Sequence, residues 1–237
     1  MLNLPPGFTA NIFAAGGMTR PRFMAFDEDG VLHVADMGGR DEDSRIFALP
    51  DRDGDGVADE RILMANDMRW VHSLAFYDGD MYAAESHRIT RFRDADGDGA
   101  YEIRETIVDD IPSFYYHWTR TIVFDEEKEK MYLSVGSPCD LCRQHEAVEG
   151  QTTTALPVSD EWGTILEFNL DGSGRRVFAN GIRNVVGLTR HPVTGELWGT
   201  HNHYDRGGGA IPPEWIGIIR DGDFMGYPLV VAPAALR

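Results

Sequence analysis

A two-strand unit recurs four times along the 237-residue chain, and this recurrence limits the possible folds more than any other feature. Each copy is a short apolar strand, a tight turn rich in Asp or Gly, and a second apolar strand. The copies cover residues 21–35, 71–84, 118–135 and 184–200. Repeats of about 40–50 residues that hold several strands are typical of propeller blades. The sequence therefore predicts an all-β protein, a β-propeller of the six-bladed type with about four blades in this chain.

The spacing of the copies supports this interpretation. Phe26 and Phe76 are 50 residues apart, Phe76 and Phe124 are 48 apart, and the equivalent Arg190 follows after 66. Unrelated hairpins in a β-sandwich are the alternative, but four copies of the same hairpin disfavour it.

We predict one propeller domain over residues 1–237. An unclosed ring leaves strand edges and apolar faces uncovered, and residues 227–237 lack a strand pattern that would close it. We expect it to be incomplete at its C-terminus, with its first and last sheets apart.

The charge of the chain excludes several classes of partner. There are 39 acidic and 22 basic residues, which gives a net charge of −17. Such a surface repels nucleic-acid phosphates and anionic lipid and suits cations and neutral substrates.

No run approaches the ~18 apolar residues of a transmembrane helix, so we predict no membrane insertion. The N-terminus lacks the basic and apolar segments of a signal peptide, so any such signal would lie outside this chain.

Two acidic loops carry carboxylates at alternate positions with glycines between them. Their sequences are D-R-D-G-D-G, with Asp51, Asp53 and Asp55, and D-A-D-G-D-G, with Asp94, Asp96 and Asp98. Calcium takes six to eight oxygen ligands, and glycine permits the sharp turn that such a loop needs. Solvated Asp-Gly turns that join two strands are an equally good interpretation. If the loops bind calcium, we expect the ions to be structural.

Polar side chains stand just before the first strand of three copies. His72 precedes the second copy, His117 the third, and Arg183 with Asn184 the fourth. The first strands of propeller blades are innermost and run in the same sense, so we expect these residues to meet at one axial mouth. A base, a cation and an amide in one cleft suit an anionic cofactor or a polarised hydroxyl. Each could instead be a rim residue satisfied by a neighbouring loop, which is the favoured interpretation for His72.

Several motifs resemble those of the soluble pyrroloquinoline-quinone (PQQ) glucose and sorbosone dehydrogenases. The fourth copy contains N-G-I-R-N-x-x-G-L followed by G-E-L-W, and the third contains H-x-x-R and M-Y-L-S-V-G-S before a C-x-x-C pair. P-P-E and G-D-F-M-G-Y-P follow near the end, in the order of the sorbosone branch. The segments are residues 117–120, 131–137, 139–142, 180–188, 195–198, 212–214 and 222–228.

This resemblance implies a six-bladed propeller that oxidises the anomeric or aldehyde carbon of a sugar, with PQQ held by Ca²⁺ and an external electron acceptor. It implies that His117 is the general base and that Arg183 and Asn184 bind the cofactor. His72, at the equivalent position of the second copy, is a further candidate cofactor contact. The family's cofactor calcium is held largely by main-chain carbonyls, which fall near His203 and Tyr204. The family also binds PQQ through basic residues of two later blades, which this chain does not contain.

Some alternatives remain open. A lactonase-like propeller hydrolase needs carboxylates at the mouth, where this chain has His and Arg, and a non-catalytic binding propeller would keep the shape alone. Cys139 and Cys142 predict a small-loop disulfide beside the mouth and hence a periplasmic or secreted protein. A softer metal held by these cysteines with His201 and His203 is a less favoured possibility.

Overall fold

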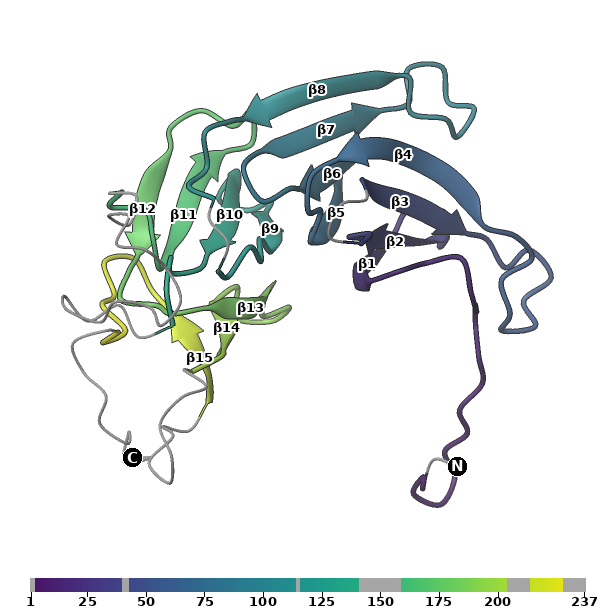
Figure 1. The fold of residues 1–237 in the computed structure, drawn as a ribbon, viewed down its shortest axis with the longest axis horizontal. Coiled ribbons are helices and arrows are strands. Elements are labelled where there is room, and N and C mark those ends of the chain that lie inside the picture. Colours follow the sequence, from purple (N-terminus) through teal and green to yellow (C-terminus); the bar gives the residue numbers. More distant parts are fainter. Residues whose placement is uncertain (1–2, 40–42, 114–115, 141–158, 204–213, 228–237) are drawn as a thin grey trace.

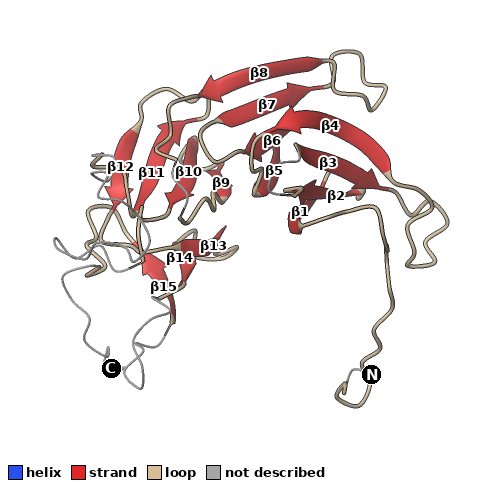
Figure 2. Ribbon diagram, in the orientation of Figure 1, coloured by secondary structure: helices blue, strands red, loops and turns tan. Residues whose placement is uncertain are grey.

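The computed structural model describes residues 3–39, 43–113, 116–140, 159–203 and 214–227. This part of the chain contains fifteen strands and no helix (Figure 2). It accordingly contains no helix that is long and apolar enough to cross a membrane. The predicted all-β class is confirmed.

The strands form four antiparallel sheets, in each of which the strands pair in the order of the chain. The first three sheets have four strands each, and the fourth has three within the described residues. In chain order the strands are β1 (Pro21–Phe26), β2 (Leu32–Asp36), β3 (Ser44–Leu49), β4 (Ile62–Met68), β5 (Ser73–Tyr77), β6 (Asp80–Ala84), β7 (Ile89–Arg93), β8 (Ile103–Val108), β9 (Ile122–Asp125), β10 (Lys130–Val135), β11 (Thr164–Asn169), β12 (Arg176–Ala179), β13 (Val185–Arg190), β14 (Leu197–His201) and β15 (Trp215–Ile219).

The sheets are arranged as the blades of a propeller. Strand β1 contacts β5, β5 contacts β9, and β9 contacts β13, so the first strand of each sheet lies innermost. Figure 1 shows the four sheets following one another along an arc, with the first and fourth apart among the described residues. Each repeat of the sequence forms the two inner strands of one sheet, as in β1–β2 and β9–β10. The predicted propeller fold is therefore confirmed.

Apolar side chains fill the three junctions between neighbouring sheets. Met81 and Ile46 lie between the first and second sheets, Met131 and Leu133 between the second and third, and Ile165 between the third and fourth. All five are fully buried. Burying one such side chain contributes about 1.5–3 kcal/mol. Strands such as β2, β6 and β10 are buried along nearly their whole length, and this burial stabilises the stack of blades.

The two ends of the propeller differ in their loops. Because each sheet is an antiparallel meander, the connections that precede β5, β9 and β13 lie at one end, which we call the mouth end. The β1–β2 turn and the β3–β4 and β7–β8 loops lie at the other, the turn end. At the mouth end the inner strands are joined across blades, since His72 O accepts from the Phe23 amide at 3.2 Å and Ser73 Oγ donates to Arg120 O at 2.7 Å.

Candidate functional site

The mouth end is organised around Gly136 and Ser137, which directly follow β10. His117 Nδ1 lies 2.7 Å from Ser137 O, and the Ser137 amide donates to Arg183 O at 2.7 Å. A Cβ on Gly136 would lie 2.4 Å from the His117 Cβ and 3.0 Å from Asn184 Oδ1, so only glycine fits there. His117, Arg183 and Asn184, which the sequence places in two different blades, are thus gathered around one short segment.

His117 has an unusual backbone and a defined ring tautomer. Its φ is 46°, in the left-handed region that residues with a Cβ adopt infrequently. A carbonyl oxygen only accepts hydrogen bonds, so the contact with Ser137 O places the proton on Nδ1. Nε2 is then the basic nitrogen of the neutral ring. His117 does not precede its strand directly, as His72 and Asn184 do, because four residues separate it from β9.

Arg183 is buried and held from three sides. Its Nε donates to Asp140 O at 3.0 Å, its Nη2 pairs with the Asp140 carboxylate, and its Nη1 donates to Asn202 O at 3.1 Å. Its amide donates to His201 Nε2 at 3.0 Å. A guanidinium has five N–H groups, so two remain for another acceptor.

Asn184 is buried beside Arg183 and joins the third and fourth blades. Its Oδ1 accepts from Thr119 Oγ1 at 2.6 Å. Its own carbonyl accepts from the Asn202 amide at 2.8 Å, which ties the residue to the segment after β14. The amide side chain is therefore held in a fixed orientation at the mouth end.

His72 lies inside the protein and not on the surface of the mouth. It is fully buried, its ring packs on Phe23 with centroids 4.7 Å apart, and its Nδ1 donates to Arg120 O at 3.1 Å. Burial, reinforced by the charge of Arg22, lowers the pKa of His72 to about 3. These contacts are those of a neutral residue that links two blades.

His201 is a second buried, neutral histidine of the mouth end. Its ring stacks on Trp215 with centroids 4.7 Å apart, and its Nε2 accepts from the Arg183 amide. Burial, then the charges of His203 and Arg183, lowers its pKa to about 3. His203 lies nearby, with ring centroids 5.5 Å apart, and burial lowers its pKa as well. Tyr204, named with His203 as a calcium contact, lies outside the described residues.

The two buried histidines predict a loss of stability in acid. Their folded pKa values of about 3 lie below the usual 6.5, so between these values the unfolded chain binds more protons than the folded one. Stability therefore falls as the pH drops from about 6.5 towards 3, by up to about 1.4 kcal/mol per pH unit for each histidine.

The variant His72→Asn tests this directly, because asparagine retains a donor towards Arg120 O and does not titrate. Urea unfolding at pH 7.5 and pH 5.0 should show that the wild type loses about 2 kcal/mol more than the variant between the two values. An equal loss in both proteins would show that His72 does not contribute to the acid sensitivity.

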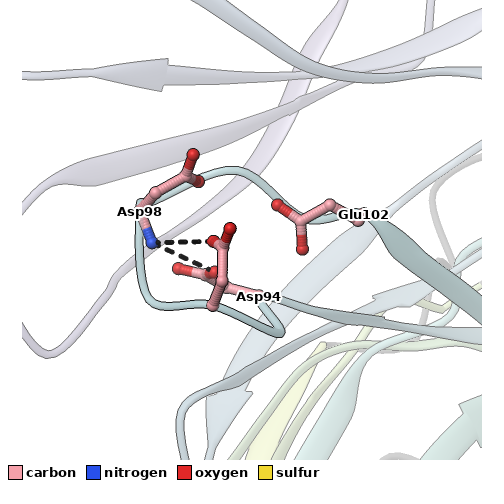
Figure 3. A group of neighbouring side chains, drawn as sticks. Asp94, Asp98 and Glu102 are labelled. Carbon is pink, nitrogen blue, oxygen red and sulfur yellow. Dashed lines mark hydrogen bonds between the residues drawn. The ribbon is translucent and has the colours of Figure 1, made fainter.

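The two acidic loops lie at the turn end, away from His117, because they connect β3 to β4 and β7 to β8. In each loop three of the predicted carboxylates come within 4.8 Å of one another, and Glu102, which the sequence analysis did not select, joins Asp94, Asp96 and Asp98. Asp94 Oδ2 accepts from the Gly99 amide at 2.8 Å, and this bond is the largest cause of a lowered Asp94 pKa. Figure 3 shows Asp98 and Glu102 beside Asp94.

Cys139 belongs to the same network as His117. It is buried, and its carbonyl accepts from Ser137 Oγ at 2.8 Å and from the Tyr227 hydroxyl at 3.2 Å. Cys142 lies outside the described residues. The predicted disulfide, and the alternative metal site that includes both cysteines, therefore stay predictions.

Several residues of the mouth end were not selected from the sequence. Asp140 pairs with Arg183 across 43 positions, and no local pattern reveals such a partner. Trp70 and Trp118 have ring centroids 5.8 Å apart and are half-buried. Both lie in connections that precede inner strands, as His72 and His117 do. Their position just before an inner strand is therefore the sequence signal that identifies them.

The fold and this site define a class of protein: a β-propeller whose mouth end gathers histidine, arginine and amide groups from adjacent blades. The particular family follows from a family model described as TrAA12-like, which matches residues 2–208. This match covers most of the chain, and the chain belongs to the TrAA12-like family.

Similar proteins of known structure share the fold at low sequence identity. The PQQ domain of pyranose dehydrogenase from Coprinopsis cinerea is 21% identical with a TM-score of 0.68, and the match covers 90% of this chain and 55% of that one. A calcium structure of a Trichoderma reesei protein of carbohydrate-active enzyme family AA12 is 20% identical with a TM-score of 0.71, covering 91% and 57%. The PQQ-bound aldose sugar dehydrogenase of Streptomyces coelicolor is 20% identical with a TM-score of 0.63, covering 96% and 69%.

A curated protein of Borreliella burgdorferi, described as an uncharacterized protein, is 23% identical over 97% of this chain. The match covers 57% of the Borreliella protein. The chain thus spans little more than half the length of this relative and of the fungal structures.

Proposed function

We propose that this chain contributes the catalytic mouth of a PQQ-dependent dehydrogenase that oxidises a sugar or another aldose. The observation that carries the proposal is the arrangement of His117, whose tautomer is defined by Ser137, beside Arg183 and Asn184 at one end of a propeller. Membership of the TrAA12-like family supports it, as do structural neighbours that are described as a PQQ domain and as a PQQ-bound aldose sugar dehydrogenase.

The residues present fit an anionic cofactor. The protein carries a net charge of −17, but Arg22, Arg120 and Arg183 lie close enough to the mouth-end histidines to lower their pKa values. Burial and then the charge of Arg20 lower the pKa of Arg22, and the pKa values of His72 and His201 are depressed in part by neighbouring arginines. This local positive field favours carboxylates, and the two remaining N–H groups of Arg183 match the geometry of a carboxylate.

The reaction we assign divides between cofactor and protein. When bound, PQQ supplies an acceptor for the hydride that leaves the sugar carbon. His117 Nε2 takes the proton of the hydroxyl on that carbon, and the Nδ1–H bond to Ser137 O stabilises the positive charge that the ring then carries. Arg183 and Asn184 bind and orient the cofactor's carboxylates and carbonyls. The half-buried rings of Trp70 and Trp118 offer an apolar surface for a sugar ring at the same end.

Calcium enters the proposal in two places. We propose that main-chain carbonyls near His203 and Tyr204 hold the ion that accompanies the cofactor. We also propose that the loops of Asp51, Asp53 and Asp55 and of Asp94, Asp96 and Asp98 hold structural ions. Closely grouped carboxylates with glycines between them form the kind of oxygen-rich donor set that calcium prefers.

The loop sites predict that calcium affects stability more than catalysis. In the double variant Asp94→Asn/Asp98→Asn, the gain in thermal stability that calcium gives the wild type should fall by several degrees, because a bound ion stabilises the folded state alone. Terbium luminescence gives an independent measurement, because Tyr101 lies beside this loop and its ring can transfer energy to a bound ion. The closeness of Tyr101 to Asp94 is seen in its pKa, which burial and then the charges of Asp27 and Asp94 raise to about 12. Unchanged terbium binding in the double variant would rule out an ion in this loop.

The setting of the reaction is part of the proposal. We infer a small-molecule sugar substrate, an external electron acceptor and a periplasmic or secreted location, the last from the expected disulfide of Cys139 and Cys142. Nucleic acid and membrane insertion are not expected, in keeping with the acidic surface.

Reduction of a redox dye by the purified protein with PQQ, Ca²⁺ and a panel of aldoses tests the function. We expect dye reduction that requires both PQQ and an aldose, and saturable quenching of protein fluorescence by PQQ. Saturable PQQ binding with no turnover on any aldose would favour a non-catalytic binding propeller. Lactone hydrolysis without PQQ would favour the hydrolase, which the His and Arg side chains of the described mouth disfavour.

A further inference from the structure

We propose that Arg120 is a positioning residue that holds His117 in its left-handed backbone conformation and thereby directs its ring towards Ser137. The inference rests on the proposed function in one respect: it takes His117 to be the base.

Arg120 is placed to act on the backbone of His117 directly. Its side chain is fully buried. Its Nη1 donates to His117 O at 3.0 Å and to Thr119 O at 2.6 Å, and its Nη2 donates to Pro112 O. A planar guanidinium can bind three carbonyls that converge from different directions, whereas an ammonium is a single point of charge. The Arg120 side chain thus links Pro112, early in the β8–β9 connection, to His117 and Thr119 near its end.

The electrostatics of Arg120 are unusual for a residue that only fills space. Among the described residues, no acidic side chain lies within ion-pair distance of Arg120, whereas Arg183, which also precedes an inner strand, pairs with Asp140. Burial lowers its pKa to about 9, so it remains charged at neutral pH. A buried cation that has only carbonyl dipoles as partners, and whose Nε makes no hydrogen bond to a described residue, is costly, and an apolar side chain would fill the same space at less cost. The three carbonyls are therefore the reason for an arginine here.

The conformation of His117 explains what these bonds accomplish. A φ of 46° is disfavoured for a residue with a Cβ, so it persists only where the surroundings impose it. The bond from Arg120 to His117 O fixes the peptide plane on one side of this residue, and Ser137 O receives the Nδ1 proton on the other. Without Arg120 the backbone can relax, and the ring then loses its fixed partner.

Arg120 is itself anchored to the second blade. Its carbonyl accepts from His72 Nδ1 at 3.1 Å and from Ser73 Oγ at 2.7 Å. This gives the buried His72 a place in the same network, as the residue that holds the backbone of Arg120. The chain of contacts runs from His72 through Arg120 to His117 and on to Ser137 and Arg183.

The variants Arg120→Met and Arg120→Lys test the proposal, with Arg175→Met as a matched control. Arg175 also donates to carbonyls of the β8–β9 connection, those of Asp109 and Asp110, at 3.0 and 3.2 Å. None of its hydrogen bonds reaches His117, so its loss disturbs the connection but not the base. The lysine variant keeps the charge and loses the three-way geometry.

The first readout uses the protein without PQQ. Nitrogen NMR of the His117 ring, assigned with the variant His117→Gln, reports which nitrogen carries the proton. We expect the Nδ1–H tautomer in the wild type and in Arg175→Met, and a mixture of tautomers in both Arg120 variants.

The second readout is turnover with PQQ and an aldose. The Arg120 variants should lose about 10- to 100-fold in kcat, since a small misplacement of a base has an effect of that order.

An unchanged His117 tautomer in a folded Arg120 variant would overturn the proposal, as would an equal change in Arg175→Met. If neither Arg120 variant folds while Arg175→Met does, Arg120 is needed for folding and the positioning role is refuted. A wild type that shows the fixed tautomer but no turnover would refute the proposed function and leave the NMR comparison to decide the role of Arg120.

Discussion

The variant His117→Ala is expected to lower kcat for sugar oxidation by about 10²- to 10⁴-fold, the range that a general base contributes. The dissociation constant for PQQ should change much less, because His117 handles the substrate's proton and is not a proposed contact of the cofactor's carboxylates. Stopped-flow dye reduction and fluorescence titration with PQQ measure the two quantities separately. The left-handed φ of 46° also predicts that Gly at this position folds at least as well as Ala.

The control is His72→Asn, which changes a fully buried histidine of the mouth end. This variant should retain most of kcat, because asparagine keeps a donor for the hydrogen bond that the His72 side chain makes to Arg120 O. If His117→Ala retains wild-type turnover, the mechanism proposed here is wrong. If both variants lose equal activity, the loss reflects the network and not the loss of a base.

The variant Arg183→Ala is expected to weaken PQQ binding by about 10- to 100-fold, because a charge-assisted hydrogen bond contributes roughly 1.5–3 kcal/mol. Removing the guanidinium also leaves the Asp140 carboxylate without its partner at the mouth, where it would repel an anionic cofactor. Breaking a buried pair in this way costs about 3–5 kcal/mol of stability, although the partial exposure of Asp140 reduces that value. Fluorescence titration with PQQ and urea unfolding measure the two effects.

The variant Asp140→Asn separates the two contributions. It removes the competing negative charge and leaves Arg183 in place, so PQQ should bind at least as tightly as in the wild type. The double variant Arg183→Ala/Asp140→Asn should recover part of the stability lost in Arg183→Ala and little of the affinity. If Arg183→Ala binds PQQ normally, Arg183 serves only to anchor Asp140 and Asn202, and the proposed cofactor contact is wrong.

The fold was predictable because its signals are local. The short apolar runs in segments such as 73–77 and 130–135, and the turns containing Asp or Gly beside them, depend on neighbours a few residues apart. Their recurrence at intervals of 48 to 50 residues indicates blades, since each repeat is one unit that must pack on the next. The gathering of His117 and Arg183 at one end follows from the common direction of the inner strands.

The tertiary structure alone decided how each polar residue is used. His72 and His117 are both histidines that stand before inner strands, yet one is fully buried and the other is half-buried with a strained backbone. That difference depends on the bond from Arg120 to His117 O and on the contact of the His117 ring with Ser137, which follows β10. The periodicity of the sequence encodes neither contact. The pairing of Arg183 with Asp140 likewise spans 43 positions. The sequence determines the repeats because apolar strands and the turns between them depend on residues that are close together in the chain. The burial of a histidine and the pairing of an arginine depend on distances between blades, which only the assembled propeller sets.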